Sequence, residues 1–431
     1  MFGLFPPTRR ILLSVSYLLS LGGLASAQMG HVLNGVGPVN QGMAGAATGA
    51  PIDPSGALHW NPGAISAIEK NEFAFGFELL IPESSVESSM PPSMGGGSGS
   101  TSSDAGESTI PSFAFLYHLE ESQWTVGLGA YGLSGFGVDY PTSSTNPILA
   151  PPAQGGFGSV YSQFQMLQLA PTFSYSINDN WSVGFAPTIN QAQLSITPAC
   201  FESPNANGEY PDGRSAAKSW GYGGQIGLFW RGSSGWSAGA SYKSTQYFED
   251  FDFNSTAADG SYRRLSLDMD FPAISSLGVG YTGFEGWTLA ADVRNIEYGS
   301  TNGFDESGFD NADFSVNGFG WDSILVLALG AEYQLSSRWR VRAGYSYNEN
   351  PISDSQSTFN LPAPAVIQHH AALGASYCFG PSTCIDFAYR HGFENSVEGP
   401  VGHPTMGEVP GSSVKNSLET DSLLLGFRVS F

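Results

Sequence analysis

The sequence predicts an all-β fold, a transmembrane antiparallel β-barrel of about 14 strands. Apolar residues recur at every second position along successive segments, as at Trp181, Val183 and Phe185. A period of two is typical of a strand whose two faces meet different surroundings. Five segments open on a tryptophan just after a cluster of turn residues: Trp124, Trp181, Trp236, Trp287 and Trp339. Indoles at the same end of strands one hairpin apart are expected of an aromatic girdle, and here they would mark the periplasmic rim.

The first residues predict an export signal at 1–27. Arg9 and Arg10 precede an apolar stretch that ends at Leu24. The small residues 25–27 then fit a signal-peptidase cleavage site. The alternative is an N-terminal membrane helix, but the apolar stretch is short for a span of about 20 residues.

Composition also favours a barrel. A soluble core built from all the residues after 27 would be expected to split into domains, whereas a closed sheet grows around a lumen. The 55 glycines and the aromatic content of 13% suit barrel strands with tight turns. The formal net charge of −22 argues against nucleic acid as a partner, because a phosphate backbone requires a basic surface.

Residues 28–69 do not read as a strand, because they are rich in glycine and alanine and contain four prolines. Residues 70–431 contain fourteen strand candidates. These centre near Phe75, Phe115, Leu128, Leu169, Phe185, Ile226, Ala240, Leu277, Ala291, Val326, Ala343, Leu373, Phe387 and Leu425.

The connections between these candidates alternate in length. Tight turns follow the even-numbered strands, and long polar loops follow the odd-numbered ones, notably at 82–109, 138–160, 198–217, 300–320 and 394–415. Short periplasmic turns and long outer loops are usual in outer-membrane barrels. The C-terminal strand alternates to a final Phe431, as barrel assembly signals do. A soluble sandwich or propeller is the alternative, but a blade would need about four short strands in each repeat of this length.

The three cysteines leave one question open. Cys378 and Cys384 flank a turn sequence, and an exported protein meets an oxidising compartment. They are therefore either a disulfide pair or two free thiols, depending on a Cβ geometry that the sequence does not contain. Cys200 lies in a predicted loop and is expected to be unpaired.

Residues Trp339 to Phe393 resemble the FadL/TodX family of outer-membrane transporters for long-chain fatty acids and other hydrophobic compounds. The resemblance rests on RVRAGYSY at 340–347, NP at 350–351, HH at 369–370, LGASY at 373–377 and IDFAY at 385–389. Pro272 to Ser276, followed by GVGY at 278–281, and the Asn61-Pro62 step are further matches.

The resemblance implies a fourteen-stranded barrel, here 70–431, plugged by an N-terminal hatch at 28–69. Asn61, Pro62 and Gly63 would be the hatch motif, although Gly63-Ala64 stands where the family has Ala-Gly. Ligand would be captured at the outer loops, pass to the lumen and leave sideways beside a kinked third strand. The Trp-x-Gly-Arg common in the family after that strand is absent. Both departures leave the ligand class open.

The third strand carries Gly132, Gly135 and Gly137 near its outer end. Glycines weaken strand pairing and permit a bulge or bend, which would suit a lateral opening. The alternative is that they only relieve crowding where the strands curve.

Arginines gather on one face of the strand that opens at Trp339: Arg338, Arg340 and Arg342. Arginine on the lipid face costs about 2–4 kcal/mol at mid-bilayer, so this face is expected to line the lumen. The same alternation places Lys243, Arg294, Arg390 and Arg428 inside, with Asp292 and Asp386. An arginine could receive an anionic head group, since its planar fork suits a carboxylate. For any single arginine we favour the alternative, a lattice of ion pairs that stabilises barrel and hatch.

We therefore expect a Gram-negative outer-membrane channel for passive uptake of hydrophobic compounds, such as long-chain fatty acids, by lateral diffusion into the bilayer. The alternatives are a general diffusion porin for small polar solutes and a structural or adhesive barrel. We expect no catalysis, cofactor or metal: His369 and His370 are adjacent in a strand, so they point to opposite faces.

The expected partners follow from this location. They are a hydrophobic small molecule (fatty acid or aromatic hydrocarbon), outer-membrane lipid and lipopolysaccharide, and the barrel assembly machinery through Phe431. We expect no nucleic acid and a monomeric protein.

Overall fold

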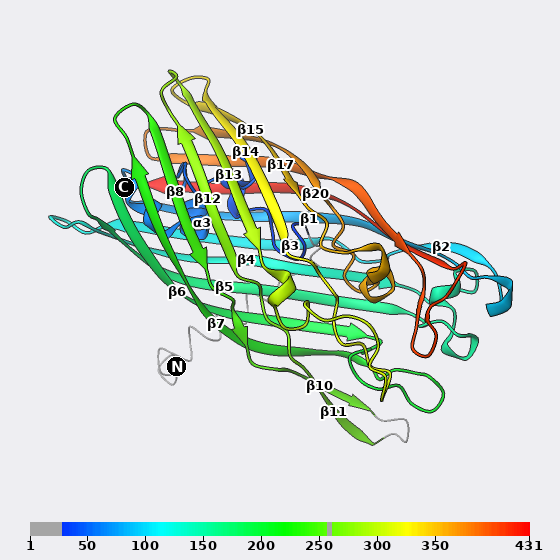
Figure 1. Ribbon diagram of the computed structural model, residues 1–431. Helices are drawn as coiled ribbons and strands as arrows, with labels where there is room; N and C mark the ends of the chain where they lie inside the picture. The colour runs from blue at the N-terminus through cyan, green and yellow to red at the C-terminus, as the bar shows by residue number, and fades with distance from the viewer. Residues whose placement is uncertain (1–27, 257–260) are drawn as a thin grey trace, which may run out of the picture.

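The computed structural model describes residues 28–256 and 261–431, so the predicted export signal lies outside the described residues. Fourteen long strands in the described part of the chain form a closed antiparallel wall, in which β1 pairs with both β20 and β3 (Figure 1). The strands of the wall are β1 (Glu72–Ser89), β3 (Ser108–His118), β4 (Trp124–Tyr140), β5 (Val160–Ser176), β6 (Trp181–Thr197), β7 (Gly213–Arg231), β8 (Trp236–Lys243), β12 (Ile274–Tyr281), β13 (Trp287–Ile296), β14 (Ile324–Gln334), β15 (Trp339–Asn348), β16 (His369–Cys378), β17 (Thr383–Gly399) and β20 (Ser413–Ser430).

The predicted fold is confirmed, and each of the fourteen expected strand centres lies within one of these strands. On β1 the outward residues Phe75, Phe77 and Leu79 are exposed, whereas Ala74, Glu78 and Leu80, which alternate with them, are buried. The two faces of the wall therefore differ as the alternation predicts, with an apolar outer face suited to lipid.

The two ends of the barrel differ. One end, here the turn end, carries six short connections: 119–123, 177–180, 232–235, 282–286, 335–338 and 379–382. The five girdle tryptophans are the first residues of β4, β6, β8, β13 and β15 at this end, and all are exposed. The opposite end, here the loop end, carries the long connections.

Several strands extend further toward the loop end than the sequence predicted. β1 reaches Ser89 and pairs there with β20, in a region expected to be a polar loop from 82. β17 likewise reaches Gly399, beyond the expected start of a loop at 394. These extensions lack the outward apolar alternation of the membrane-facing part, so hydrophobicity did not reveal them.

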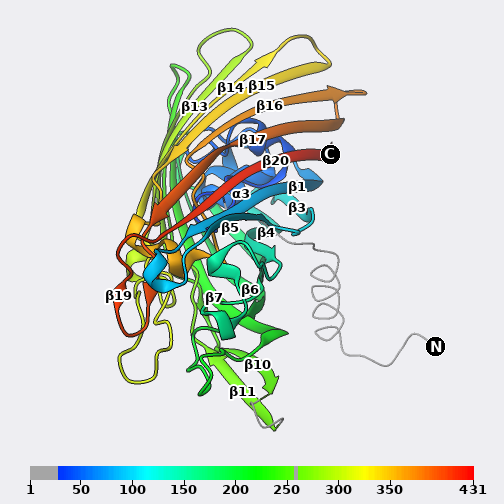
Figure 2. The same ribbon diagram turned by 90° about the vertical axis from the view of Figure 1, so that its right-hand side faces the viewer.

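The loop end also contains elements that were not foreseen. The small strands are β2 (Ser98–Ser102), β9 (Tyr247–Phe248), β10 (Phe251–Thr256), β11 (Tyr262–Leu267), β18 (Gly402–His403) and β19 (Gly407–Glu408). The short helices are η2 (Pro92–Met94), η3 (Pro147–Leu149), η4 (Pro152–Gln154), η5 (Tyr298–Ser300) and η6 (Asp354–Asn360). The β10–β11 hairpin projects from the wall at this end (Figures 1 and 2).

The N-terminal segment lies inside the ring of strands, where the hatch was expected (Figure 2). It contains α2 (Gly37–Gly42), α3 (Pro54–Trp60) and η1 (Pro62–Ala67). Asp53 caps α3 by accepting hydrogen bonds from the backbone N–H groups of Ser55 and Gly56, and Pro54 occupies the first helical position. Residues 28–50 are all buried, so the segment has the burial of a core.

Glycines of the wall allow the hatch backbone to approach closely. A Cβ added at Gly374 of β16 would lie 3.2 Å from the Cα of Gly42, and one at Gly330 of β14 would lie 2.9 Å from the Cβ of Met43. Similar close contacts with the hatch occur at Gly184, Gly227, Gly239, Gly278 and Gly344. A side chain at these positions would displace the hatch, because neither backbone can give way cheaply.

The two ends predict how a thiol label reaches the protein in intact cells. Asn180 of a turn and Thr405 of a long loop are both exposed. In a Cys200→Ser background, we expect an impermeant maleimide to label Thr405→Cys in unbroken cells and Asn180→Cys only after the outer membrane is permeabilised. Labelling of Asn180→Cys in intact cells would reverse the orientation.

Candidate functional site

The hatch motif Asn61-Pro62-Gly63 attaches the hatch to the wall. The side-chain amide of Asn61 donates to the carbonyls of Thr48 at 2.9 Å and of Leu228 in β7 at 3.0 Å. Its oxygen accepts from the N–H of Gly63, which caps η1. The Gly63 carbonyl accepts from the hydroxyl of Ser182 in β6 at 2.7 Å. One asparagine thus joins two parts of the hatch to the barrel.

The arginines expected inside are mostly buried and paired with carboxylates. Among the described residues the side-chain pairs are Arg294–Asp292 at 2.7 Å, Arg342–Glu332 at 2.5 Å, Arg390–Glu78 at 2.8 Å and Arg428–Asp386 at 3.3 Å. Arg340 is half-buried near the turn end. The prediction for Arg338 was wrong: it is exposed in the turn, because β15 begins one residue later.

Two of these pairs also hold the hatch. Arg294 donates to the carbonyl of Gly45 at 2.6 Å, and Asp292 accepts from the N–H groups of Ala47 and Thr48 at 2.8 and 2.9 Å. Arg390 donates to the side chain of Gln41. This arrangement matches the lattice of stabilising ion pairs rather than a free guanidinium that waits for an anion.

Lys243 differs from these arginines. It is buried, and its ammonium donates to Gln168 at 3.2 Å and lies 3.3 Å from Nδ1 of His59 in the hatch. The described residues offer it no carboxylate within ion-pair distance.

Near Lys243, residues 235–239 read Gly-x-Ser-x-Gly, a spacing that sequence reasoning overlooked. The serine, Ser237, opens no strand-to-helix turn and instead donates to the carbonyl of Gly49 in the hatch at 2.6 Å. The context of a catalytic nucleophile is therefore missing.

A gap in strand pairing lies beside β4, the third strand of the wall. β3 and β4 pair from His118–Thr125 to Ser112–Tyr131, and in the described structure this ladder ends there. β3 continues along β1, and β4 continues along β5 after a register shift between Gly132 and Ser134.

The position of the bulge refines the expectation from the three glycines. Leu133 is the extra residue, so Gly132 directly precedes the irregularity. Gly135 and Gly137 lie beyond it in regular pairs with Gln165 and Gln163 of β5.

The hatch occupies the free edge of β4. The N–H of Leu33 donates to the carbonyl of Leu133 at 2.9 Å, while the carbonyl of His31 accepts from the N–H of Gly135 and the hydroxyl of Ser134 at 3.1 and 2.7 Å. A small cavity lies beside these contacts, lined by Leu33, Ile110 and Gly132 among others. At the loop end the N–H of Asp104 closes the gap by donating to Asp139 of β4 at 2.7 Å.

A second, apolar cavity of about 80 Å³ lies among the long loops. Its lining includes Phe157, Ile196, Phe201, Leu267, Phe319 and Phe359, and the free Cys200. Sequence reasoning missed this cavity. The only signal was that segments expected to be polar loops contain several phenylalanines.

An aromatic cluster lies between this cavity and the hatch. Phe319 of the cavity wall packs against Phe304 and Trp321, with ring centroids 5.4 and 5.8 Å apart. Phe304 in turn stacks on the ring of His31 at 4.7 Å. Phe136 of β4 also packs against Phe319, at 5.9 Å. The cavity, the hatch and the bulged strand are therefore in continuous side-chain contact.

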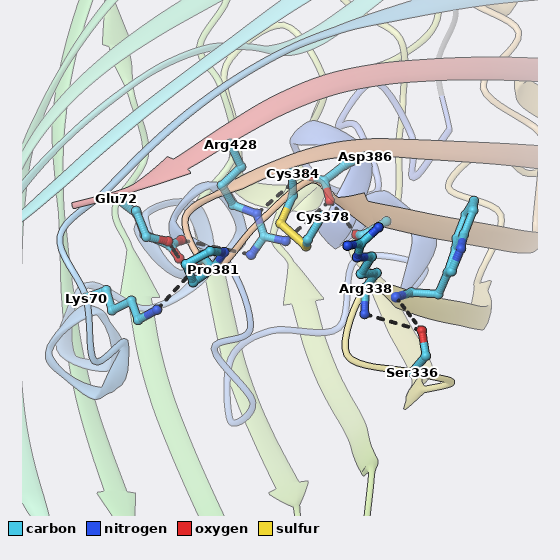
Figure 3. Close-up of a disulfide and its surroundings, with 12 residues drawn as sticks. Lys70, Glu72, Ser336, Arg338, Cys378, Pro381, Cys384, Asp386 and Arg428 are labelled. Carbon is cyan, nitrogen blue, oxygen red and sulfur yellow. Dashed lines mark hydrogen bonds and ion pairs between the residues drawn. A yellow bond between two sulfur atoms is a disulfide. The ribbon is translucent and has the colours of Figure 1, made fainter.

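At the turn end, Cys378 and Cys384 form a disulfide across the turn between β16 and β17 (Figure 3). The ammonium of Lys70, where the hatch leads into β1, lies 3.4 Å from the carbonyl of Pro381 in the same turn. The Arg428–Asp386 pair lies beside it (Figure 3). The disulfide therefore stabilises a turn that also contacts the residue just before β1.

A family model described as outer membrane protein transport protein (OMPP1/FadL/TodX) matches residues 18–431. The chain belongs to the OMPP1/FadL/TodX family. The match spans both hatch and wall, and it confirms the resemblance and the outer-membrane location that the sequence suggested.

Individual relatives in the OMPP1/FadL/TodX family are distant. The long-chain fatty acid transport protein of Escherichia coli O6:H1 is 21% identical over 84% of this chain and 87% of the relative. The alkane uptake protein A of Marinobacter nauticus is 30% identical over 21% of each chain.

Solved structures of the OMPP1/FadL/TodX family share the fold. The toluene transporter TodX of Pseudomonas putida superposes with a TM-score of 0.67 at 19% identity, covering 93% of this chain and 99% of TodX. A FadL homologue of Pseudomonas aeruginosa gives 0.66 at 15% identity, over 95% and 99%. Identities this low establish the fold of the family and no more.

Proposed function

We propose that this protein is an outer-membrane channel for passive uptake of hydrophobic compounds, such as long-chain fatty acids, which leave the lumen by lateral diffusion into the bilayer. The family is a family of outer-membrane transport proteins. Relatives and neighbours bear the names long-chain fatty acid transport protein, alkane uptake protein and toluene transporter. Apolar solutes need such a protein because a water-filled pore offers them no favourable surroundings.

Capture would begin at the apolar cavity at the loop end, which at about 80 Å³ takes only part of a long-chain ligand. Its phenylalanines come from separate loops and from η6, and together they offer an apolar solute a site out of water. The aromatic cluster of Phe319, Phe304 and Trp321 then continues the apolar surface toward the hatch.

The axial route would be closed to this ligand. Residues 28–50 are buried inside the barrel, and wall glycines bring the hatch into backbone contact. Asn61, Arg294 and Arg390 add hydrogen bonds between hatch and wall. Such a filled lumen argues against a general diffusion porin.

One observation carries the proposal. The ladder between β3 and β4 ends at Ser112–Tyr131, and beyond this pair the hatch backbone forms hydrogen bonds with the free edge of β4. Open sheet edges are costly in a bilayer, so a persistent gap in the wall calls for an explanation. The hatch contacts at His31 and Leu33 are few and local, so they can separate without breaking the barrel. An exit here would deliver an apolar ligand sideways.

The remaining partners are proposed on the same basis. Outer-membrane lipid and lipopolysaccharide would contact the apolar outer face, and Phe431, which is exposed at the turn end, would be read by the barrel assembly machinery. We propose that the protein acts as a monomer, since the closed wall needs no partner strand. We also propose that it is not an enzyme, since its family is one of transport proteins.

Two fluxes test the proposal in a host that lacks its own hydrophobic transporter. Expression of this protein should raise uptake of a labelled long-chain fatty acid or alkyl-aromatic, and leave permeation of a small sugar near that of the empty host. Sugar flux that rises while hydrophobic uptake does not would favour a porin. No change in either flux would favour a structural or adhesive barrel.

A further inference from the structure

His31 of the hatch places a polar ring in the middle of the aromatic cluster. Its side chain is fully buried, and its ring centroid lies 4.7 Å from that of Phe304, 5.3 Å from Tyr298 and 5.4 Å from Phe271. Through its backbone carbonyl the same residue holds β4 at the bulge. His31 therefore stands between the loop-end cavity and the gap in the wall.

The hydrogen bonds of Tyr298 fix the tautomer of His31. The Tyr298 hydroxyl lies 2.9 Å from the carbonyl of Met29, which can only accept, so its single proton is used there. The Tyr298 oxygen also accepts from the backbone N–H of His31 at 3.0 Å. Nδ1 of His31 lies 3.1 Å from that oxygen and must donate to it, because no second hydroxyl proton remains.

Nε2 of His31 is consequently a bare acceptor. Burial lowers the pKa of His31 to about 3, so the ring is neutral and a proton on Nδ1 leaves a lone pair on Nε2. Among the described residues Nε2 has no hydrogen-bond partner. A buried acceptor without a hydrogen bond is unfavourable in free energy. A bound molecule that donates a hydrogen bond to Nε2 would remove that cost.

Nearby polar groups of the cluster have their donors engaged elsewhere. The indole N–H of Trp321 donates to Asn360 at 2.5 Å, and the hydroxyl of Tyr298 is used as described. The lumenal arginines Arg294, Arg342 and Arg390 are each paired with a carboxylate. An anionic head group would thus meet no free guanidinium at His31, and it would be repelled by the lone pair.

We infer that the aromatic cluster takes neutral ligands that carry one hydroxyl donor on an apolar body, phenols and related alcohols, and that Nε2 of His31 accepts the hydrogen bond of that hydroxyl. This inference rests on the proposed function and narrows its substrate class. The lone pair of Nε2 lies in the plane of the imidazole, so a ligand reaches it at the ring edge and not at the face on which Phe304 stacks. Such a ligand contacts the residue whose own backbone carbonyl holds β4 at the bulge.

Three probes of one shape test the inference: p-cresol, which donates, 4-methylanisole, which only accepts, and p-xylene, which does neither. Binding is measured by isothermal titration calorimetry on the full protein in nanodiscs. His31→Phe keeps an aromatic ring and removes the acceptor. We expect it to weaken p-cresol binding by about fivefold to tenfold, the value of one ordinary hydrogen bond, and to leave p-xylene within about twofold.

Tyr298→Phe gives a readout that a merely structural role would not produce. Without the Tyr298 oxygen the imidazole proton can move to Nε2, which then donates. We expect p-cresol to lose its advantage and 4-methylanisole to bind more tightly than in the wild type. Unchanged p-xylene binding shows in each variant that the site is still folded.

The outcomes separate the inference from the proposed function. If the wild type binds none of the three probes, the inference is overturned, whereas uptake of a labelled long-chain fatty acid decides the proposed function separately. If it binds all three and His31→Phe lowers p-cresol and p-xylene alike, only the inference is overturned. Retention of the p-cresol affinity in His31→Phe, as expected if Nε2 meets only a water molecule, also overturns it.

Discussion

Oxidation of an Ile110→Cys, Gly132→Cys double variant is expected to reduce uptake of a labelled hydrophobic compound to the level of cells without the channel, and reduction should restore it. The two positions face each other across the gap between β3 and β4. A Cβ at Gly132 would lie 3.9 Å from the Cβ of Ile110, within the range of about 3.5–4.5 Å that a disulfide needs. The new bond would close the proposed exit while leaving the loop-end cavity open.

The controls isolate the cross-link from the substitutions. The work is done in a Cys200→Ser background, because that thiol is free in the parent protein. Ile110→Cys alone, and Gly132→Cys combined with Ile110→Ala to remove the methyl that lies 2.6 Å from the added Cβ, should transport normally in both redox states. The parent chain, which keeps the Cys378–Cys384 disulfide, shows what reductant alone does. Complete cross-linking with undiminished uptake would eliminate lateral exit at this gap.

Replacement of Asp292 by alanine is expected to release the hatch. The carboxylate accepts from Arg294 and from two backbone N–H groups of the hatch, at Ala47 and Thr48. Its loss leaves a buried guanidinium, stacked 3.5 Å over the ring of Trp60, without its counter-charge. Removal of one partner from a buried ion pair typically costs about 3–5 kcal/mol. The hatch should become mobile and the barrel conductive.

Single-channel recording in planar bilayers measures this effect. A closed parent and a conducting Asp292→Ala variant are expected. The wall should survive, because its strands hold their own hydrogen bonds, so the variant should still migrate as a folded barrel on unheated gels. Asp386→Ala, which likewise deprives a buried arginine of a carboxylate but for which the described residues show no hydrogen bond to the hatch, serves as the matched control and should stay closed. Parent-like conductance in Asp292→Ala would show that this pair does not hold the hatch.

The wall of the barrel was predictable because its information is local. A period of two, a tryptophan after each tight turn and the cost of arginine in lipid fix strands and faces within a dozen residues of sequence. The same reasoning failed at strand ends, where Arg338 belongs to the turn and not to β15. It also failed where β1 and β17 extend toward the loop end beyond the apolar outer face, because their outward residues there are no longer apolar.

The candidate site was predictable only in part, because its contacts join distant segments. Gly132 marked the bulge, but no sequence pattern linked His31 to Tyr298, which lies 267 positions away. The loop-end cavity is made of phenylalanines in segments without periodicity, such as Phe201 and Phe319, so their convergence appears only in three dimensions. Most carboxylate partners of the lumenal arginines, by contrast, lie on the same strand, as Asp292 does for Arg294, or on a paired strand, as Glu332 does for Arg342.

The contact of Arg390 with Glu78 and Gln41 implies an order of events during biogenesis. Gln41 precedes every strand, Glu78 lies in the first one, and Arg390 arrives 312 residues after Glu78 and 349 after Gln41. The wall closes where β20 meets β1. These hatch contacts can therefore form only after the last strands are made. The two ends of the chain are joined twice in the finished barrel, once in the wall through β1 and β20 and once in the lumen through Gln41 and Arg390.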